Sequence, residues 1–198
     1  MNSRTLPAQM DGRRMRSARS RESIVHALFE LVGEGRLQPT AQQVAERAGV
    51  DIRTVFRHFS DMDTLFVEMD QRLRDEVRPL LDDVPADGTL EDRAAALVAR
   101  RVEIFERITP YKRSANLQRR RSVFLQREHR DHVRMMRVDL MRWLPELSDA
   151  PEDLVEALDQ VTSFEAWDRL REEQRLATRR ALSAMERSVV ALVRGLVD

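Results

Sequence analysis

Two arginines in the first third of the chain have the type and spacing needed to contact base pairs. Arg53 and Arg57 are four positions apart, so in a helix they lie on one face. A guanidinium donates two hydrogen bonds to the O6 and N7 atoms of guanine, and one good pair of this kind contributes about 1–3 kcal/mol of discrimination. These side chains are therefore the first candidates for contacts in the major groove of DNA.

Two short helices separated by a glycine turn would position these arginines. They are predicted within Thr40–Leu65, which reads TAQQVAERAGVDIRTVFRHFSDMDTL. Thr40 and Gln43 have the spacing of a capping box, Asp51 can cap the second helix, and Gly49 provides the turn. An ordinary helical hairpin shares this periodicity, but it does not need polar side chains of base-contacting size on its outer face. The pattern therefore favours a helix-turn-helix.

The residues from Ala45 to Leu65 resemble the end of the DNA-binding domain of TetR-family repressors. That family follows a pattern close to A-x-x-A-G-V-[S/D]-x-x-T-[L/V]-[Y/F]-x-H-F-x-x-K-x-x-L, and apolar residues upstream extend the resemblance over the first third of this chain. Two positions depart from the frequent residues, because Phe56 replaces a tyrosine and Met62 replaces a lysine. Each change removes a group that family members can use to hold phosphate.

A basic N-terminal arm is the expected substitute for these phosphate contacts. Residues 1–21 contain six arginines and one acidic residue, whereas the whole chain has a formal net charge of zero. Arginines in such an arm can contact phosphate or enter a narrow minor groove. A disordered, solvated tail would have the same composition, so this alternative stays open.

A set of ten residues is predicted to bind DNA. Gln42 and Thr54 are second choices for base contacts, and the resemblance implies that Thr40 and His58 touch phosphate. The full set is Thr40, Gln42, Arg53, Thr54, Phe56, Arg57, His58, Arg13, Arg14 and Arg16.

Helical periodicity continues through the rest of the chain, and no strand pattern competes with it. We predict an all-α protein with a flexible basic arm at residues 1–19, a three-helix helix-turn-helix domain at 20–66 and a helical domain at 67–198. The resemblance implies that this last domain binds an effector and forms a dimer.

Prolines set several of the expected helix ends. Pro79 disfavours helical geometry at Arg78, and Thr109-Pro110 is expected to break the helix that starts near Thr89. A shorter helix would then begin at about Tyr111.

A small-molecule effector is implied by the resemblance, since family pockets are enclosed by the helices that follow the DNA-binding domain. The large or polar candidates on these helices are Leu97, Arg101, Phe105, Tyr111, Asn116, Phe124, Met136, Phe164 and Trp167. Ordinary core packing explains aromatic residues at this spacing as well. Residues 112–137 carry nine cations and two acids, which leaves open both an anionic effector and simple attraction to the acidic segment 145–173.

Apolar seams near the C-terminus are wide enough to meet a second chain. The predicted interface residues are Leu158, Leu182, Met185, Val189, Leu192, Val193 and Leu196. The same surface could instead close the core of a single chain. A twofold homodimer would place two recognition helices on DNA, so we expect a palindromic double-stranded operator.

Other functional classes have little support in the sequence. The chain has no cysteine, no glycine cluster that could hold phosphate, and no apolar run long enough to span a membrane. Glu128, His129 and His132 lie within one helical turn but lack a third ligand at suitable spacing, so no metal, cofactor or enzymatic activity is expected. The sequence predicts a cytoplasmic, ligand-responsive repressor. A regulator without an effector and a helical protein-interaction module are the alternatives.

Overall fold

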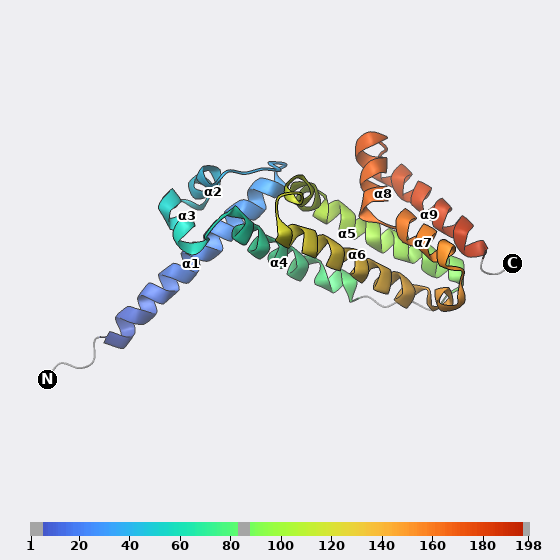
Figure 1. Cartoon of the computed structure of the whole chain (residues 1–198), viewed down its shortest axis with the longest axis horizontal. Helices are drawn as coiled ribbons and strands as arrows, with labels where there is room; N and C mark the ends of the chain where they lie inside the picture. Colours follow the sequence, from blue (N-terminus) through green and yellow to red (C-terminus); the bar gives the residue numbers. More distant parts are fainter. Residues whose placement is uncertain (1–5, 83–87, 196–198) are drawn as a thin grey trace. The chain divides into compact units, whose positions relative to one another are not determined.

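The structure is a computed structural model that describes residues 6–82 and 88–195, and over these ranges it contains helices and no strand (Figure 1). The chain forms two compact units. Unit 1 contains the residues up to Glu76 together with Pro110–Leu125, and unit 2 contains Val77–Thr109 and the residues from Gln126 onward. Because residues 110–125 belong to unit 1, the units do not follow the contiguous division at residue 66. None of the helices in the described ranges is apolar over a length that would cross a bilayer.

Unit 1 is built on the long helix α1 (Leu6–Gly33), and the short helices α2 (Ala41–Ala48) and α3 (Ile52–His58) pack against it (Figure 1). The first part of α4 (Met62–Leu81) completes this unit. Inward-facing positions of these helices are almost fully buried: Ile24, Leu28, Val44, Ala45, Val55, Phe59 and Leu65. The apolar faces predicted from helical spacing therefore form one core, and α2 with α3 forms the predicted helix-turn-helix.

Local hydrogen bonds explain where α2 and α3 begin. The Thr40 hydroxyl accepts from the backbone N–H of Gln43 at 3.3 Å, and the Gln43 side-chain oxygen accepts from the N–H of Thr40 at 2.9 Å. The Asp51 carboxylate accepts from the N–H of Arg53 at 2.7 Å. Gly49 has φ +66° at the end of α2, a left-handed conformation that glycine adopts without strain. The predicted caps and turn are confirmed.

The described part of the predicted N-terminal arm is helical, because α1 begins at Leu6. The side chains of Arg14, Arg16 and Arg19 are exposed on this helix, and Arg16 Nε donates to the carbonyl of Gly12 at 3.1 Å. The side chain of Arg13 lies outside the described part of the structure. The arginines thus continue the helix that supports α2 and α3.

Residues 111–114 explain why a distant stretch of the chain belongs to unit 1. The ring of Tyr111 stacks on Phe29 of α1 with centroids 4.4 Å apart. The Ser114 hydroxyl donates to the carbonyl of Leu37, just before α2, at 2.6 Å. An added Cβ on Gly33 would lie 3.0 Å from the Tyr111 hydroxyl oxygen, so a larger residue would require the end of this side chain to shift by a few tenths of an ångström. These contacts fix the C-terminal part of α5 against α1.

The predicted break at Thr109-Pro110 is wrong, because α5 runs from Leu90 to Gln118 through Pro110. A proline removes one backbone donor and costs about 3 kcal/mol inside a helix. Here the Thr109 hydroxyl donates to the carbonyl of Phe105 at 2.6 Å, and both Ile108 and Tyr111 are buried. Side-chain burial on both sides of the proline outweighs its local cost, so a second helix does not have to start at Tyr111.

The interpretation of Pro79 is corrected in the same way, since α4 continues through Arg78 to Leu81. Pro79 lies in the last turn of the helix, where the ring disturbs few further hydrogen bonds. Val77 in the preceding turn is buried. Burial near the end of α4 is thus sufficient to keep Arg78 helical.

Unit 2 is an assembly of helices around a second core. After α5 its elements are α6 (Val123–Trp143), the 3-10 helix η1 (Pro145–Asp149), α7 (Glu152–Val161), α8 (Phe164–Asp168), the π-helical turn η2 (Arg169–Glu173) and α9 (Thr178–Arg194). α7 packs against α9. Ala181, Met185, Val189 and Val193 form a buried ridge along α9. This ridge follows the apolar spacing seen in the sequence.

Candidate nucleic-acid interface

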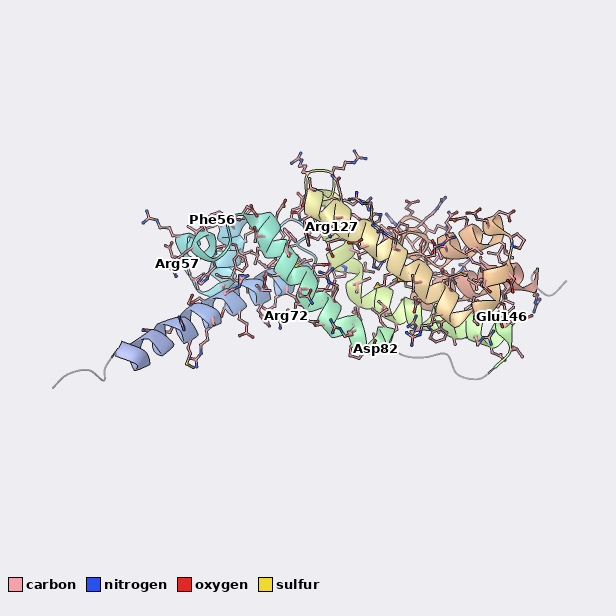
Figure 2. The ribbon with its side chains drawn as sticks, turned by 60° about the horizontal axis from the view of Figure 1, so that its bottom comes forward. Phe56, Arg57, Arg72, Asp82, Arg127 and Glu146 are labelled. Carbon is pink, nitrogen blue, oxygen red and sulfur yellow. The ribbon has the colours of Figure 1, made fainter. Side chains whose placement is uncertain are left out.

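The outer face of α3 carries three exposed side chains of contrasting chemistry. Arg53, Phe56 and Arg57 occupy positions i, i+3 and i+4, and all three are exposed. Phe56 and Arg57 lie together on this helix in Figure 2. Val55 and Phe59, which lie toward the core, are each only 1% exposed. The register of α3 therefore holds two guanidiniums and one aromatic ring outward.

Contacts on the inner side hold α3 in this orientation. The Arg21 guanidinium lies over the ring of Phe59, 4.5 Å from its centroid, and donates to the carboxylate of Glu68 at 2.7 Å. Arg21 thus connects α1, the end of α3 and α4 within unit 1. Because α3 has only seven residues, these contacts supply order that its own backbone hydrogen bonds cannot.

The start of α2 places two further predicted residues on the surface. Thr40 is exposed, and its hydroxyl oxygen already accepts the capping hydrogen bond while its proton remains available to donate. Gln42 is exposed as well, and its amide donates to Glu46 at 2.8 Å. Thr54 on α3 is only partly exposed. The helix N-terminus at Thr40 can attract a phosphate oxygen, whereas Gln42 would have to release Glu46 before it reads a base.

Arg47 shows why exposure alone does not identify a DNA contact. Its guanidinium forms two hydrogen bonds with the carboxylate of Glu34, at 2.7 and 2.8 Å, and lies 3.6 Å from Glu30. The hydrogen bond from Arg47 lowers the pKa of Glu34. Arg53 and Arg57 have no carboxylate partner among the residues that the structure describes. Of these arginines, Arg53 and Arg57 are the ones that can pair with an incoming base or phosphate.

His58 at the end of α3 is partly buried. Its Nε2 atom is buried and has no hydrogen-bond partner among the described residues. Burial lowers the pKa of His58 below its ordinary value of 6.5, and the positive charges of Arg57 and Arg21 lower it further. A neutral imidazole is therefore favoured at neutral pH, and a role in phosphate binding for this residue stays a prediction.

The structure divides the predicted effector residues between the two units. Tyr111, Asn116 and Phe124 belong to unit 1, where Tyr111 stacks on Phe29. The other six belong to unit 2 and are buried: Leu97, Arg101, Phe105, Met136, Phe164 and Trp167. The rings of Phe105 and Phe164 meet edge to face with centroids 5.6 Å apart. The nine residues are thus not gathered in one unit, and an effector role for either group stays a prediction.

A buried polar cluster surrounds Arg101 in unit 2. Arg101 is fully buried and donates to the hydroxyl and carbonyl oxygens of Thr162, at 2.6 and 3.0 Å, and to the carbonyl of Met136 at 2.6 Å. Asp139 lies 3.4 Å from Arg101 and also pairs with Arg100. Burial lowers the pKa of Arg101 to about 10, although Asp139 opposes the shift.

Sequence reasoning missed Asp139 and Thr162 as partners of Arg101. The available signal was the position of polar residues within apolar helical faces, since Arg101 lies one turn from both Leu97 and Phe105. Which polar residues would meet depends on how α5, α6 and the end of α7 pack, and periodicity does not specify that packing.

The predicted interface residues of the C-terminal helices are largely covered within unit 2. Leu158, Met185, Val189 and Val193 are buried, while Leu182 and Leu192 are partly exposed. Leu196 lies outside the described residues. Four of these side chains thus close the core of their own chain, and the partly exposed leucines remain available to a second chain. Glu128, His129 and His132 do not form a group that could hold a metal ion within the described ranges.

Residues 24–69 of the sequence match the family model described as bacterial regulatory proteins, tetR family. The matched range runs from the second half of α1 through α2 and α3 into α4, and it includes the exposed face of α3. No curated protein has a matching sequence. The match therefore concerns the segment that carries the helix-turn-helix.

Solved structures of similar fold cover most of the chain. A transcriptional regulator from Rhodococcus sp. RHA1 has a TM-score of 0.69 at 22% identity, and the alignment covers 88% of this chain and 96% of that one. A TetR transcriptional regulator from the same organism has a TM-score of 0.57 at 20% identity, with coverages of 88% and 94%. A protein described as a TetR-family regulator from Mesorhizobium loti has a TM-score of 0.56 at 22% identity, with coverages of 92% and 96%. At these identities the likeness is one of fold.

Proposed function

We propose that the chain is a non-enzymatic, DNA-binding transcriptional regulator of the TetR family, and that it represses transcription from a palindromic operator as a homodimer. In this proposal a small-molecule effector, bound by the helical core of unit 2, releases the operator. The protein would act in the cytoplasm.

The outward face of α3 is the observation that carries the proposal. Arg53 and Arg57 are exposed and have no carboxylate partner in the described ranges, while Val55 and Phe59 fix the opposite face in the core. A helix held in this way can enter the major groove and donate to guanine without first breaking internal ion pairs. The capped start of α2 adds a site for a phosphate oxygen.

Dimerisation is a requirement of this mode of recognition. One seven-residue helix covers only a few base pairs, whereas a twofold dimer places two such helices on half-sites one or more helical turns apart. Leu182, Val190 and Leu192 are partly exposed apolar side chains on α9 that support a second chain at this helix. The expected operator is an inverted repeat.

Effector response requires a difference in affinity between two states of the protein. A small molecule that prefers the state unable to match the half-site spacing shifts the population toward that state and releases DNA. The effector candidates of unit 2 include Arg101, and a ligand bound there would have to replace the contacts of this guanidinium with Thr162 and Asp139.

Selection of bound sequences from random double-stranded DNA tests the proposal. We expect the recovered sequences to contain an inverted repeat, and the full-length protein to bind it far more tightly than random DNA at moderate salt. Recovery of a single unrepeated half-site would contradict the dimeric mode. Binding without sequence preference would contradict the regulatory function altogether and favour an interaction module.

A further inference from the structure

Phe56 is a large apolar side chain on the face of α3 that carries the base-contacting candidates. Half of its surface is exposed, whereas Val55 of α3 and Phe59, the C-cap residue that follows the helix, are 1% exposed. The register of α3 explains the difference for Val55, which precedes Phe56 by one position and occupies the inward face of the helix. Phe56 therefore cannot join the core without turning Arg53 and Arg57 inward.

The chemistry of Phe56 restricts what it can contact on DNA. A phenyl ring has no hydrogen-bonding group, so it cannot donate to a phosphate oxygen as a tyrosine would. Among the base edges of the major groove, the C5-methyl group of thymine is the apolar feature, and phenylalanine is one of the side chains that pack on it. An exposed Phe56 on the DNA-facing side of α3 thus matches a thymine methyl.

The spacing along α3 limits where this thymine can be. A helix rises about 1.5 Å per residue, so Phe56 lies roughly 4.5 Å along the axis from Arg53 and one residue from Arg57. Successive bases on one strand are about 3.4 Å apart along the duplex. A methyl group contacted by Phe56 is therefore within one or two base pairs of a guanine contacted by either arginine.

We propose that Phe56 is a specificity-determining residue that packs on the C5-methyl group of a thymine located within one or two base pairs of a guanine in each half-site. This inference rests on the proposed function, because it requires α3 to enter the major groove. It specifies the base that is recognised, the chemical group that is contacted and the distance of that base from a guanine.

Replacement of thymine by deoxyuridine tests the contact, since it removes only the methyl group and leaves base pairing unchanged. The operator recovered by selection would be synthesised with one thymine replaced at a time, symmetrically in both half-sites. We expect one position near a guanine to lose about fourfold in affinity per half-site, the effect of withdrawing one buried methyl group from the interface. The other thymines should tolerate the replacement.

Two variants connect the methyl effect to Phe56. With Phe56→Ala, we expect weaker binding of the operator recovered by selection. The affinities for this operator with thymine and with deoxyuridine at the sensitive position should be equal. With Phe56→Leu, which keeps an apolar side chain, the sensitivity should be retained in part. Circular dichroism serves as the folding control, and both variants should stay folded because the side chain is half exposed.

The result that would overturn the inference is specific. If wild-type protein binds the operator selectively but tolerates deoxyuridine at every thymine, Phe56 does not contact a methyl group. A methyl effect that persists at full size in Phe56→Ala would assign the contact to another residue. Failure of the wild-type protein to select any sequence would instead refute the proposed function, so the two failures are distinguishable.

Discussion

At the scale of single residues, the neighbouring side chains determine whether an exposed arginine in unit 1 is held in an ion pair or is available to DNA. Arg47 and Arg53 are both exposed arginines of the helix-turn-helix. Arg47 faces two carboxylates, Glu30 in the last turn of α1 and Glu34 just after the helix, and is held by them. Arg53 has no such neighbour in the described ranges. This difference between Arg47 and Arg53 arises from the packing of α2 against α1, so the composition of the helix-turn-helix does not reveal it.

Replacement of Arg53 by alanine tests base recognition directly. We expect Arg53→Ala to lose about 1–3 kcal/mol of binding free energy on the selected operator and little on random DNA, because a bidentate contact to guanine is sequence-specific. Fluorescence anisotropy with both DNAs at one salt concentration measures the two losses. Arg47→Ala is the matched control and should leave the ratio of affinities unchanged. Equal losses on both DNAs for Arg53→Ala would remove its role in base recognition.

His58 should make the stability of the protein depend on pH. Its pKa in the folded state is lowered below the ordinary value of 6.5, so the unfolded chain binds a proton more readily. The stability contributed by neutral His58 is therefore complete above pH 6.5 and is lost as the pH falls through 6.5 toward the lower folded value. Urea unfolding at pH 7.5 and 5.5 should show a smaller pH effect in His58→Gln than in the wild-type protein.

A second histidine of unit 1 provides the control for this experiment. His26 is exposed and lies 3.5 Å from Glu30. His26→Gln makes the same substitution at an exposed position and therefore controls for the effect of the substitution itself. If His58→Gln and the wild-type protein lose the same free energy of unfolding between the two pH values, burial of His58 does not govern this dependence.

At the scale of helices, caps that can be recognised in the sequence account for the start of α2. Thr40→Ala removes the hydroxyl that accepts from Gln43, and the free energy of unfolding should fall by about 1 kcal/mol. Thr40→Ser retains the hydroxyl and should lose much less. Urea titrations of the three proteins measure the difference. A Thr40→Ser variant as unstable as Thr40→Ala would show that the methyl group, and not the cap, stabilises this position.

The buried cluster of unit 2 connects three segments and should be costly to disrupt. Asp139→Ala leaves the guanidiniums of Arg100 and Arg101 without their shared carboxylate, so we expect a loss of about 3–5 kcal/mol in the free energy of unfolding. Glu156→Ala removes a surface partner of Arg137 at 2.7 Å and should cost less than about 1 kcal/mol. Similar losses in the two variants would contradict a stabilising role of the cluster.

Local signals and long-range packing differ in how well the sequence predicts them. The caps at Thr40 and Asp51, the turn at Gly49 and the outward arginines of α3 follow from residues within a few positions of each other, and they were predictable. The continuation of α5 through Pro110 depends on the burial of residues on both sides, which outweighs a local rule. Segments that meet from far apart in the chain, such as Ser114 and Leu37, leave no periodic signal.

The same distinction applies to the candidate sites. The exposed face of α3 was predicted because it depends on one short helix. The effector candidates were chosen for size and polarity on several helices, and the structure places them in different units. Asp139 was not predicted, because the role of a single acidic residue on α6 is evident only when its pairing with Arg100 and Arg101 on α5 is known. Sites assembled from several helices require the packing to be known.

At the scale of the whole molecule, the proposed dimer has to use surface that the single chain leaves uncovered. The ridge of Met185, Val189 and Val193 on α9 is buried within unit 2 and holds the chain's own core together. Leu182 and Leu192 are the predicted interface residues with surface still exposed in the described part of α9. A second copy that covers them would remove apolar area from water, at about 25 cal/mol per Å².

Charge placed on this surface should separate the two copies. We expect Leu192→Arg to shift the protein from dimer to monomer in light scattering coupled to size exclusion, because a guanidinium would be buried without a partner in the interface. Operator affinity should fall with it, since a monomer engages one half-site, while affinity for random DNA should change less. Ser183→Arg adds the same charge at an exposed position on the side of α9 opposite Leu192 and should remain dimeric. A folded Leu192→Arg protein that stays dimeric and keeps its operator affinity would place the interface elsewhere.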